Sequence, residues 1–153
     1  MADIALRRET IPAIGDEALA RLMDFEGRVL QAPQVPVCTD HVLHAGQYTR
    51  TLFMPQGMVI TGALVKIPTT LIVQGDVLVS IGDEARRLKG YAVLAAAAHR
   101  KQAFVALEDT HLTMTFPTQA KTVEEAEREF TDDADRLASR LPEAINTFTI
   151  TSD

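Results

Sequence analysis

The stretch Thr70-Leu-Ile-Val-Gln-Gly-Asp-Val-Leu-Val-Ser-Ile81 decides the fold class. It consists of two short runs of apolar and β-branched residues on either side of the triplet Gln74-Gly-Asp76. Runs of this composition, separated by glycine and aspartate, are typical of β-strands joined by a turn. We therefore predict one strand at residues 70–74 and a second at residues 77–81.

The same pattern recurs on both sides of this stretch. Between His41 and Phe116, runs rich in Val, Ile, Leu, Thr and Phe alternate with glycine and proline. About eight short strands at this spacing are too many for one flat sheet of ordinary size, so we predict a mainly β fold, either a double-sheet sandwich or a small barrel. The further strands are expected at Tyr48–Met54, Val59–Ile67, Ala85–Leu88, Tyr91–Ala95, Ala103–Leu107 and His111–Phe116.

An amphipathic helix is expected before this region. From Asp16 to Leu30 the apolar residues recur at the three-and-four spacing of a helix, and Asp16 is a suitable N-cap. Pro33 and Pro36 follow closely and cannot continue a helix, so the helix is expected over residues 16–31. Residues 32–40 are predicted to form an extended linker.

A second helix is expected after the strand region. The sequence Thr122-Val-Glu-Glu125 is a capping box, and an apolar stripe continues from it to Leu141. Thr131-Asp-Asp133 would divide this helix in two if it breaks there, and residues 145–153 are either a terminal strand or a loose tail. We expect a single domain over residues 1–153, with helices at 16–31 and 122–141 and the barrel at 41–118.

The composition excludes several classes of protein. With 46% hydrophobic residues and a formal net charge of -6, the chain of 153 residues is not disordered as a whole. No apolar stretch approaches the roughly 20 residues that cross a bilayer, and the first residues do not resemble a signal peptide. A pI near 5.2 argues against nucleic acid as a partner. Because Cys38 is the single cysteine, we expect a reducing, cytoplasmic location.

Several short motifs follow one another in order between residues 33 and 129. They are Pro33-Gln34, His41, Gly46-Gln-Tyr48-Thr-Arg50, Pro55-Gln-Gly57, Gly62, Gly75-Asp76, Ala106-Leu-Glu-Asp-Thr110, Pro117-Thr118 and the Thr-x-x-Glu sequence that starts at Thr122. Together they resemble the cupin superfamily, and within it they are most similar to small stand-alone cupin-like proteins of phages and prophages. This resemblance implies a double-stranded β-helix, which is a jelly-roll barrel with flanking helices.

The resemblance also implies that the usual cupin metal is absent. Two cupin motifs supply the metal ligands, and counting from Gly57 and Gly90 places those positions on Ala63, Val65, residues 68–70 and Lys101. Methyl, isopropyl and ammonium groups cannot hold iron, zinc or manganese, which need imidazole, thiolate or carboxylate donors. We therefore expect no metal site and no cofactor. A metal site built from the four histidines, His41, His44, His99 and His111, is not favoured either.

The candidate ligand-binding residues are Arg50, Lys101, Thr70, Val65 and Ala63. Tyr48 and Arg50 share a strand face, and they would form a polar or anionic site if that face is the barrel interior. If the face is exterior, Arg50 would instead pair with a carboxylate across a subunit contact. Ala63 and Val65 are expected to point into the barrel together with Ile72, while Phe53, Ile60 and Leu64 face the other side.

Three hypotheses for the function follow. The first is a metal-less cupin-like barrel, possibly of phage origin, that acts as a small-ligand-binding or assembly module without catalysis, its ligand having an anionic end. The second is a metal-independent isomerase or lyase with His99 as base and Tyr48 as acid. The third is a phage inhibitor or other partner-binding protein. Since the strand at Val59–Ile67 is apolar on both faces, a homodimer is also expected, with neither nucleic acid nor membrane as a partner.

Overall fold

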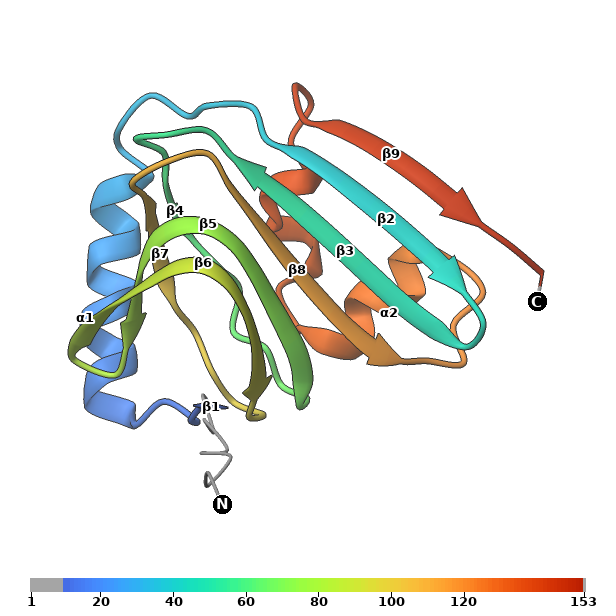
Figure 1. The fold of residues 1–153 in the computed structure, drawn as a ribbon, viewed down its shortest axis with the longest axis horizontal. Coiled ribbons are helices and arrows are strands. Elements are labelled where there is room, and N and C mark those ends of the chain that lie inside the picture. The colour runs from blue at the N-terminus through green and yellow to red at the C-terminus, as the bar shows by residue number, and fades with distance from the viewer. Residues whose placement is uncertain (1–9, 153) are drawn as a thin grey trace, which may run out of the picture.

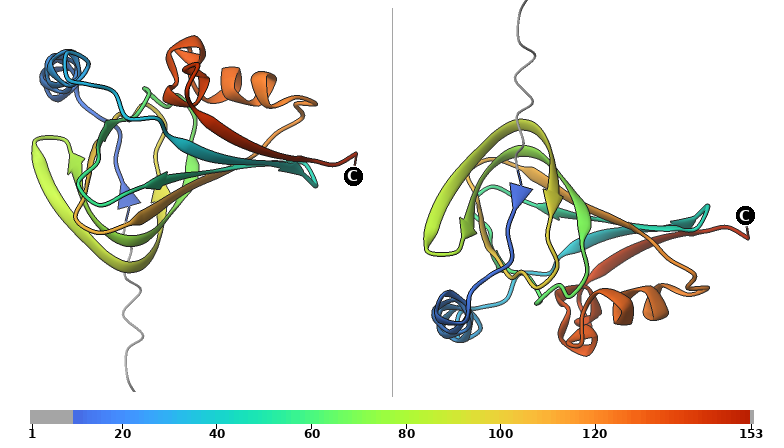
Figure 2. Two further views of the ribbon diagram at one scale, coloured as in Figure 1. Left: turned by 90° about the horizontal axis from the view of Figure 1, so that it is seen from above. Right: turned by 90° about the horizontal axis from the view of Figure 1, so that it is seen from below.

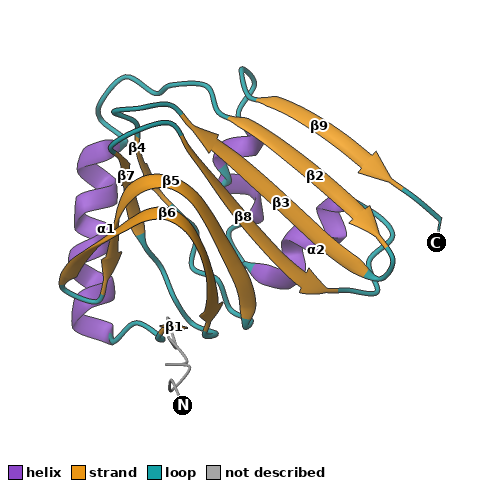
Figure 3. Ribbon diagram, viewed as in Figure 1, coloured by secondary structure: helices purple, strands orange, loops and turns teal. Residues whose placement is uncertain are grey.

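The computed structural model describes residues 10–152, and this part of the chain is a mainly β fold with flanking helices (Figures 1 and 3). The predicted fold class is confirmed. Neither α-helix of the described chain is long and apolar enough to span a bilayer. The elements are β1 (Thr10–Ile11), α1 (Asp16–Val29), β2 (Cys38–His44), β3 (Gln47–Met54), β4 (Val59–Thr61), β5 (Thr69–Ile81), β6 (Glu84–Ala96), β7 (Ala103–Ala106), β8 (Thr110–Pro117), α2 (Val123–Phe130), the 3-10 turns η1 (Ala134–Arg136) and η2 (Ala138–Arg140), and β9 (Ile145–Ile150).

The strands form two faces that share one long hairpin. Along the first face the order is β6, β5, β8, β3, β2 and β9, with all neighbours antiparallel except β2 and β9. On the second face, β4 pairs with β7, and β7 pairs with the far half of β5 at Val77–Val79. The hairpin of β5 and β6 curls from one face to the other and makes the structure a barrel, as the end-on views in Figure 2 show. This winding of paired strands is the jelly roll that the resemblance to cupins implies.

The hairpin itself differs from the sequence prediction. Residues 70–74 and 77–81 were expected to be two strands separated by a turn, whereas the structure has one strand of 13 residues, and β6 is likewise a single strand of 13 residues. Gly75 and Gly90 lie opposite each other in the register and both have positive φ, +144° and +92°. Positive φ at both positions lets the paired strands bend together without losing their hydrogen bonds. The glycines therefore mark a bend within a strand and not a turn between strands.

Thr110 holds this bend from inside the barrel. Its hydroxyl accepts a hydrogen bond from the Asp76 backbone N–H at 3.1 Å and donates to the Glu108 carbonyl at 2.9 Å. Gly75 lies directly on this threonine, since a Cβ built there would overlap the Thr110 hydroxyl and come within 2.7 Å of the Asp109 carbonyl. The contact leaves no room for any side chain at position 75.

The strand that was expected at Val59–Ile67 is shorter, because β4 ends at Thr61. Beyond it, the chain keeps contact with the opposite segment through separate backbone bonds, from the Gly62 N–H to Gln102 and from the Val65 N–H to Arg100. The linker expected at residues 32–40 is also shorter, since β2 begins at Cys38. The structure thus places the first barrel strand earlier than the prolines suggest.

The two helices begin where the sequence predicts them, but each differs in detail. Gly15 is the N-cap of α1 and Asp16 lies in its first turn, where a carboxylate still favours the helix dipole. The helix expected at 122–141 ends at Phe130, and Thr131 is extended. The Thr131 hydroxyl accepts a hydrogen bond from the Asp133 backbone N–H at 3.2 Å, a local bond that competes with helix continuation. Two 3-10 turns and β9 follow.

Two clusters of buried side chains form the core. One fills the barrel around Met54, Val77 and Val79, and the other lies between the first sheet and α2, around Tyr48 and Phe130. In β5 the buried residues before the bend have odd numbers, so that Leu71 and Val73 face inward. The expectation that Ile72 faces the barrel interior is therefore wrong, because the strand is in the opposite phase.

The contact at Gly75 gives a test of the bend. Gly75→Ala is expected to lower the free energy of unfolding by about 2–5 kcal/mol, because the new methyl group meets Thr110 and the Asp109 carbonyl in a backbone conformation that disfavours side chains. Gly90→Ala is the matched control: it has positive φ but nothing within 4 Å, so it should cost only about 1–2 kcal/mol. Urea denaturation of both variants measures the difference, and equal losses would contradict the role given to Thr110.

Candidate functional site

A cavity of about 350 Å³ lies between the barrel wall, α1 and the segment that follows α2. Figure 2 shows that α1 and this segment lie on the same side of the sheets. Exposed Leu30, Arg136 and Leu141 lie at the edge of the cavity and mark its opening. Its apolar wall includes Leu52, Ile60, Leu71, Phe104, Leu112 and Met114.

The strand register explains which side chains reach this cavity. Arg50 of β3 lies opposite Met114 of β8, and Met114 lies opposite Leu71 of β5, so these three side chains share the inner face. Leu52 and Leu112, which lie opposite each other two residues away, occupy the same face. Arg50 is thus the one cation among these five side chains, and its guanidinium is 5.2 Å from the centre of the Phe130 ring.

Glu127 of α2 neutralises Arg50 from above the sheet. Its carboxylate lies 3.1 Å from Arg50 and 2.9 Å from Arg140, and its side chain is only 4% exposed. Arg140 also pairs with the exposed carboxylate of Asp135 at 3.0 Å. The guanidinium of Arg50 donates a further hydrogen bond to the Ser139 hydroxyl at 3.2 Å. These four charged side chains form a balanced group that fastens α2 and the 3-10 turns to the barrel.

Lys101 makes the corresponding connection to α1. Its ammonium lies 2.9 Å from the carboxylate of Glu26 and donates to the Gly62 carbonyl at 2.8 Å. The Lys101 side chain is 7% exposed, and both partners of the pair line the cavity. Lys101 is therefore also neutralised by a carboxylate.

Arg100 is different from the other cations, because its positive charge is not compensated. Its guanidinium donates to the Ala97 carbonyl at 2.8 Å, the Ile67 carbonyl at 3.2 Å and the Thr69 hydroxyl at 2.6 Å. All of these acceptors are neutral, and within residues 10–152 no carboxylate pairs with it. Arg100 is 3% exposed, and burial lowers its pKa to about 10. A desolvated, uncompensated guanidinium on a cavity wall attracts an anion.

The structure places the candidate residues from the sequence in different environments. Arg50, Lys101, Ala63 and Val65 all line the cavity. Thr70 does not line it; the buried threonine is its neighbour Thr69, which accepts a hydrogen bond from Arg100. The reason is that the odd-numbered residues of β5 face inward before the bend, which also turns Ile72 outward.

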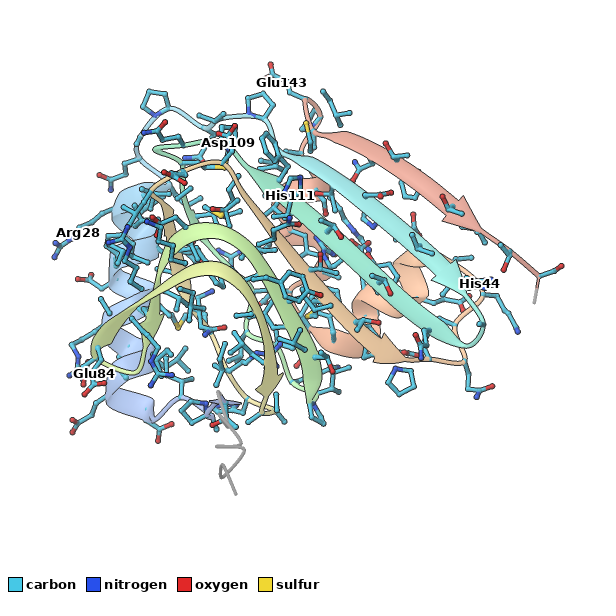
Figure 4. All side chains as sticks on the ribbon, viewed as in Figure 1. Arg28, His44, Glu84, Asp109, His111 and Glu143 are labelled. Atoms are coloured by element: carbon cyan, nitrogen blue, oxygen red, sulfur yellow. The ribbon has the colours of Figure 1, made fainter. Side chains whose placement is uncertain are left out.

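The two catalytic candidates lie away from the cavity. His99 is exposed, with a positive φ of +56°, and it is not part of the cavity wall. Tyr48 is fully buried beneath α2 and also does not line the cavity. His111 is exposed on the outer face, and His44 lies at the end of the β2–β3 hairpin (Figure 4). The arrangement does not bring an acid and a base together in the cavity.

Tyr48 instead belongs to a buried polar network with His41. The phenol lies 2.6 Å from His41 Nδ1, and His41 Nε2 lies 2.7 Å from Asn146 Oδ1 of β9. Since the Asn146 amide nitrogen donates to the Ser139 carbonyl at 2.8 Å, its oxygen must accept, which assigns the His41 proton to Nε2. Burial raises the pKa of Tyr48 to about 12, so the phenol is neutral and donates to Nδ1. Burial also lowers the pKa of His41, which favours the neutral imidazole.

The lowered pKa of His41 predicts a pH dependence of stability. The unfolded chain binds a proton at this histidine near pH 6.5, whereas the folded protein binds it only at lower pH, so the free energy of unfolding should fall as the pH drops below about 6.5. His41→Gln should remove this part of the pH dependence, and the exposed control His99→Gln should retain it. Denaturant unfolding at several pH values between 7.5 and 5 measures the effect. The same slope in His41→Gln as in the wild type would contradict it.

The residues at the cavity do not fit a metal ion. The positions implied by the cupin resemblance supply the methyl group of Ala63, the isopropyl group of Val65 and the ion-paired ammonium of Lys101. No histidine lines the cavity, and the described part of the chain contains no group of three or more His, Cys, Asp or Glu residues that could hold a metal. Of the two carboxylates at the cavity wall, Glu26 is used in an ion pair and Asp133 is exposed to solvent. The cavity residues are therefore suited to an organic ligand and not to a metal ion.

Sequence reasoning missed Arg100 and Glu127. Glu127 lies at helical spacing with Val123, Ala126 and Phe130, so its position on the buried stripe was visible in the sequence as a charge on an apolar face. Arg100 lies between His99 and Lys101 in a run of three basic residues, and nothing in the sequence shows that Arg100 and Lys101 are buried while His99 is exposed. The positive φ of His99 turns the chain there and directs Arg100 inward.

The strand pairings are those of the jelly roll that the resemblance implies. The fold is a jelly roll. Similar solved structures include a cupin superfamily protein (DSY2733) from Desulfitobacterium hafniense, with 15% identity, a TM-score of 0.46, and coverage of 57% of this chain and 83% of that chain. KdgF from Halomonas sp. shows 23% identity and a TM-score of 0.44 over 54% of this chain and 78% of that chain. An RmlC-like cupin from Desulfovibrio desulfuricans shows 16% identity and a TM-score of 0.44 over 57% and 91%.

These similarities are partial and describe the fold alone. No protein-family model matches the sequence, and no curated protein matches it either.

Proposed function

We propose that this protein binds a small organic molecule with one anionic end in the barrel cavity, and that binding without catalysis is its function. The observation that carries this proposal is Arg100, a buried guanidinium on the cavity wall whose hydrogen-bond acceptors within the described residues are all neutral. Burying a charge without a counter-charge costs several kcal/mol, and an anionic ligand in the cavity would offset that cost.

The remaining cations of the site support one anionic group and not several. Arg50 and Arg140 are neutralised by Glu127 and Asp135, and Lys101 is neutralised by Glu26. Arg136, at the opening of the cavity, is exposed to solvent, so Arg100 is the one buried cation of the cavity wall that has no carboxylate beside it within residues 10–152. A single carboxylate is therefore the matching ligand group.

The rest of the cavity favours an apolar ligand body. Leucine, isoleucine, phenylalanine and methionine side chains form much of its wall, and its volume of about 350 Å³ lies at the lower end of the range for small-molecule sites. A medium-chain or aromatic carboxylic acid combines the required charge with a body of this kind.

The alternative of a metal-independent isomerase or lyase receives no support from this arrangement. General acid–base chemistry needs a titratable group within reach of the substrate, and both His99 and Tyr48 lie outside the cavity wall. The phage relation, the partner-binding alternative and the homodimer remain predictions from the sequence.

Charge removal at Arg100 tests the proposal. Octanoate should bind to the protein, and neutral octanamide should bind roughly 10- to 100-fold more weakly, because it lacks the charge that meets the guanidinium. Arg100→Met should reduce octanoate binding to the level of octanamide, whereas Arg86→Met, at an exposed arginine outside the cavity, should leave it unchanged. Isothermal titration calorimetry measures the affinities.

Thermal unfolding accompanies this experiment, to establish that each variant is folded before it is titrated. Arg100→Lys is a second variant in case Arg100→Met does not fold; it keeps the charge and should retain preference for octanoate over octanamide. The proposal is wrong if folded Arg100→Met binds octanoate as tightly as the wild type. It is also wrong if octanoate, phenylbutyrate and indole acetate all fail to bind the wild type.

A further inference from the structure

Two polar side chains on the cavity wall are buried without a hydrogen-bond partner. The amide nitrogen of Gln102 and the hydroxyl of Thr39 both lack a partner among the described residues, although their residues are only 6% and 3% exposed. Both residues line the cavity. Buried polar groups are nearly always hydrogen-bonded in folded proteins, so a pair of unsatisfied groups in one cavity indicates that something else satisfies them.

Gln102 is held in place by its backbone and not by its side chain. Its carbonyl accepts a hydrogen bond from the Gly62 N–H at 2.9 Å, which fixes the segment against the strand opposite. The side-chain nitrogen carries two N–H donors, and donors of this kind need an acceptor oxygen. The amide nitrogen is thus a donor without an acceptor, in a residue that lines the cavity.

Gln102 also lies close to Arg100 in the chain. The two residues are separated only by Lys101, and both line the cavity. Two residues apart, their Cα atoms are at most about 7 Å from each other. We therefore expect a ligand whose carboxylate meets Arg100 to extend past Gln102.

We propose that the ligand is an oxygenated monocarboxylate: its carboxylate binds Arg100, and an acceptor oxygen within its body binds the amide of Gln102. This inference rests on the proposed function and adds the class of ligand to it. A ketone or hydroxyl oxygen a few bonds from the carboxylate satisfies the Gln102 donor, and the hydroxyl of Thr39 offers a second polar contact. A purely hydrocarbon chain would leave both groups unsatisfied.

A dicarboxylate does not fit the same cavity. Inside the cavity, away from the exposed Arg136 at its opening, a second negative charge would have to lie against the apolar wall or compete with Glu26 and Glu127 for cations that are already paired. Gln102 is neutral and offers hydrogen bonds without a compensating charge. The site therefore selects for a neutral oxygen and not for a second carboxylate.

The test compares octanoate with octanoates that carry a ketone at carbon four, five or six, and with the dicarboxylate octanedioate. At least one oxo-acid should bind the wild-type protein roughly fivefold or more tightly than octanoate, as expected for one additional hydrogen bond. Octanedioate should bind more weakly than octanoate. Isothermal titration calorimetry on the full chain measures all five affinities.

Gln102→Met tests whether this amide is responsible, since methionine has a similar volume and no donor. The advantage of the oxo-acid should disappear, while octanoate binding should change by less than about twofold. Gln74→Met is the matched control at an exposed glutamine outside the cavity and should retain the advantage. Gln102→Leu serves the same purpose if Gln102→Met does not fold.

The stability of the ligand-free variant provides a second measurement. Because the Gln102 amide nitrogen has no partner to lose, Gln102→Met should unfold at the same temperature as the wild type or higher. A large decrease in unfolding temperature would show that the amide is satisfied within the protein, and would overturn the inference.

The binding results separate this inference from the proposed function. If octanoate binds through Arg100 but no oxo-acid binds more tightly, or the advantage persists in Gln102→Met, the proposed function stands and the oxygenated ligand is wrong. If octanedioate binds more tightly than octanoate, the inferred single charge is wrong. If neither octanoate nor any oxo-acid binds the wild type, the proposed function itself fails.

Discussion

The structure depends on the bend shared by β5 and β6. Before the bend, β5 pairs with β8 in the first sheet, and after it β5 pairs with β7 in the second. A straight hairpin would belong to only one sheet, and the two faces could not enclose a common interior. Gly75 permits the bend because it can lie against Thr110 without a side chain. The cavity therefore depends on Gly75, because a side chain at this position would prevent the bend of β5 and β6.

Electrostatics connects the flanking helices to this interior. Glu26 brings α1 to Lys101, and Glu127 brings α2 to Arg50, so each helix places one carboxylate against a cation of the barrel. Loss of either carboxylate would leave a buried charge unpaired, which is commonly more costly than the gain from the ion pair itself. The two helices are thus held against the barrel by ion pairs at the cavity. Arg100 is the buried cation of the cavity wall that neither helix neutralises.

The sequence predicts those features that depend on local spacing. The apolar periodicity of Asp16–Val29 is sufficient for α1, and alternating β-branched runs are sufficient for the mainly β class. It fails where the outcome depends on contacts between distant segments. Gly75-Asp76 has the composition of a turn and becomes a bend because Gly90 lies opposite, and the phase of β5, which places Thr69 inside in place of Thr70, is set by pairing with β8. Arg100 could not be distinguished from its basic neighbours for the same reason.

The pairing of β9 with β2 has a consequence for the order of folding. Asn146 and His41 are 105 residues apart, yet they share a hydrogen bond, and β9 lies parallel to β2 along six residue pairs. The first barrel strand thus acquires its outer neighbour only after nearly all of the intervening chain has been made. During synthesis on the ribosome, the edge of β2 remains open and the imidazole of His41 lacks its amide partner until β9 emerges. Contacts of such long range close slowly, so this edge of the sheet should be the last part of the molecule to become protected against hydrogen exchange.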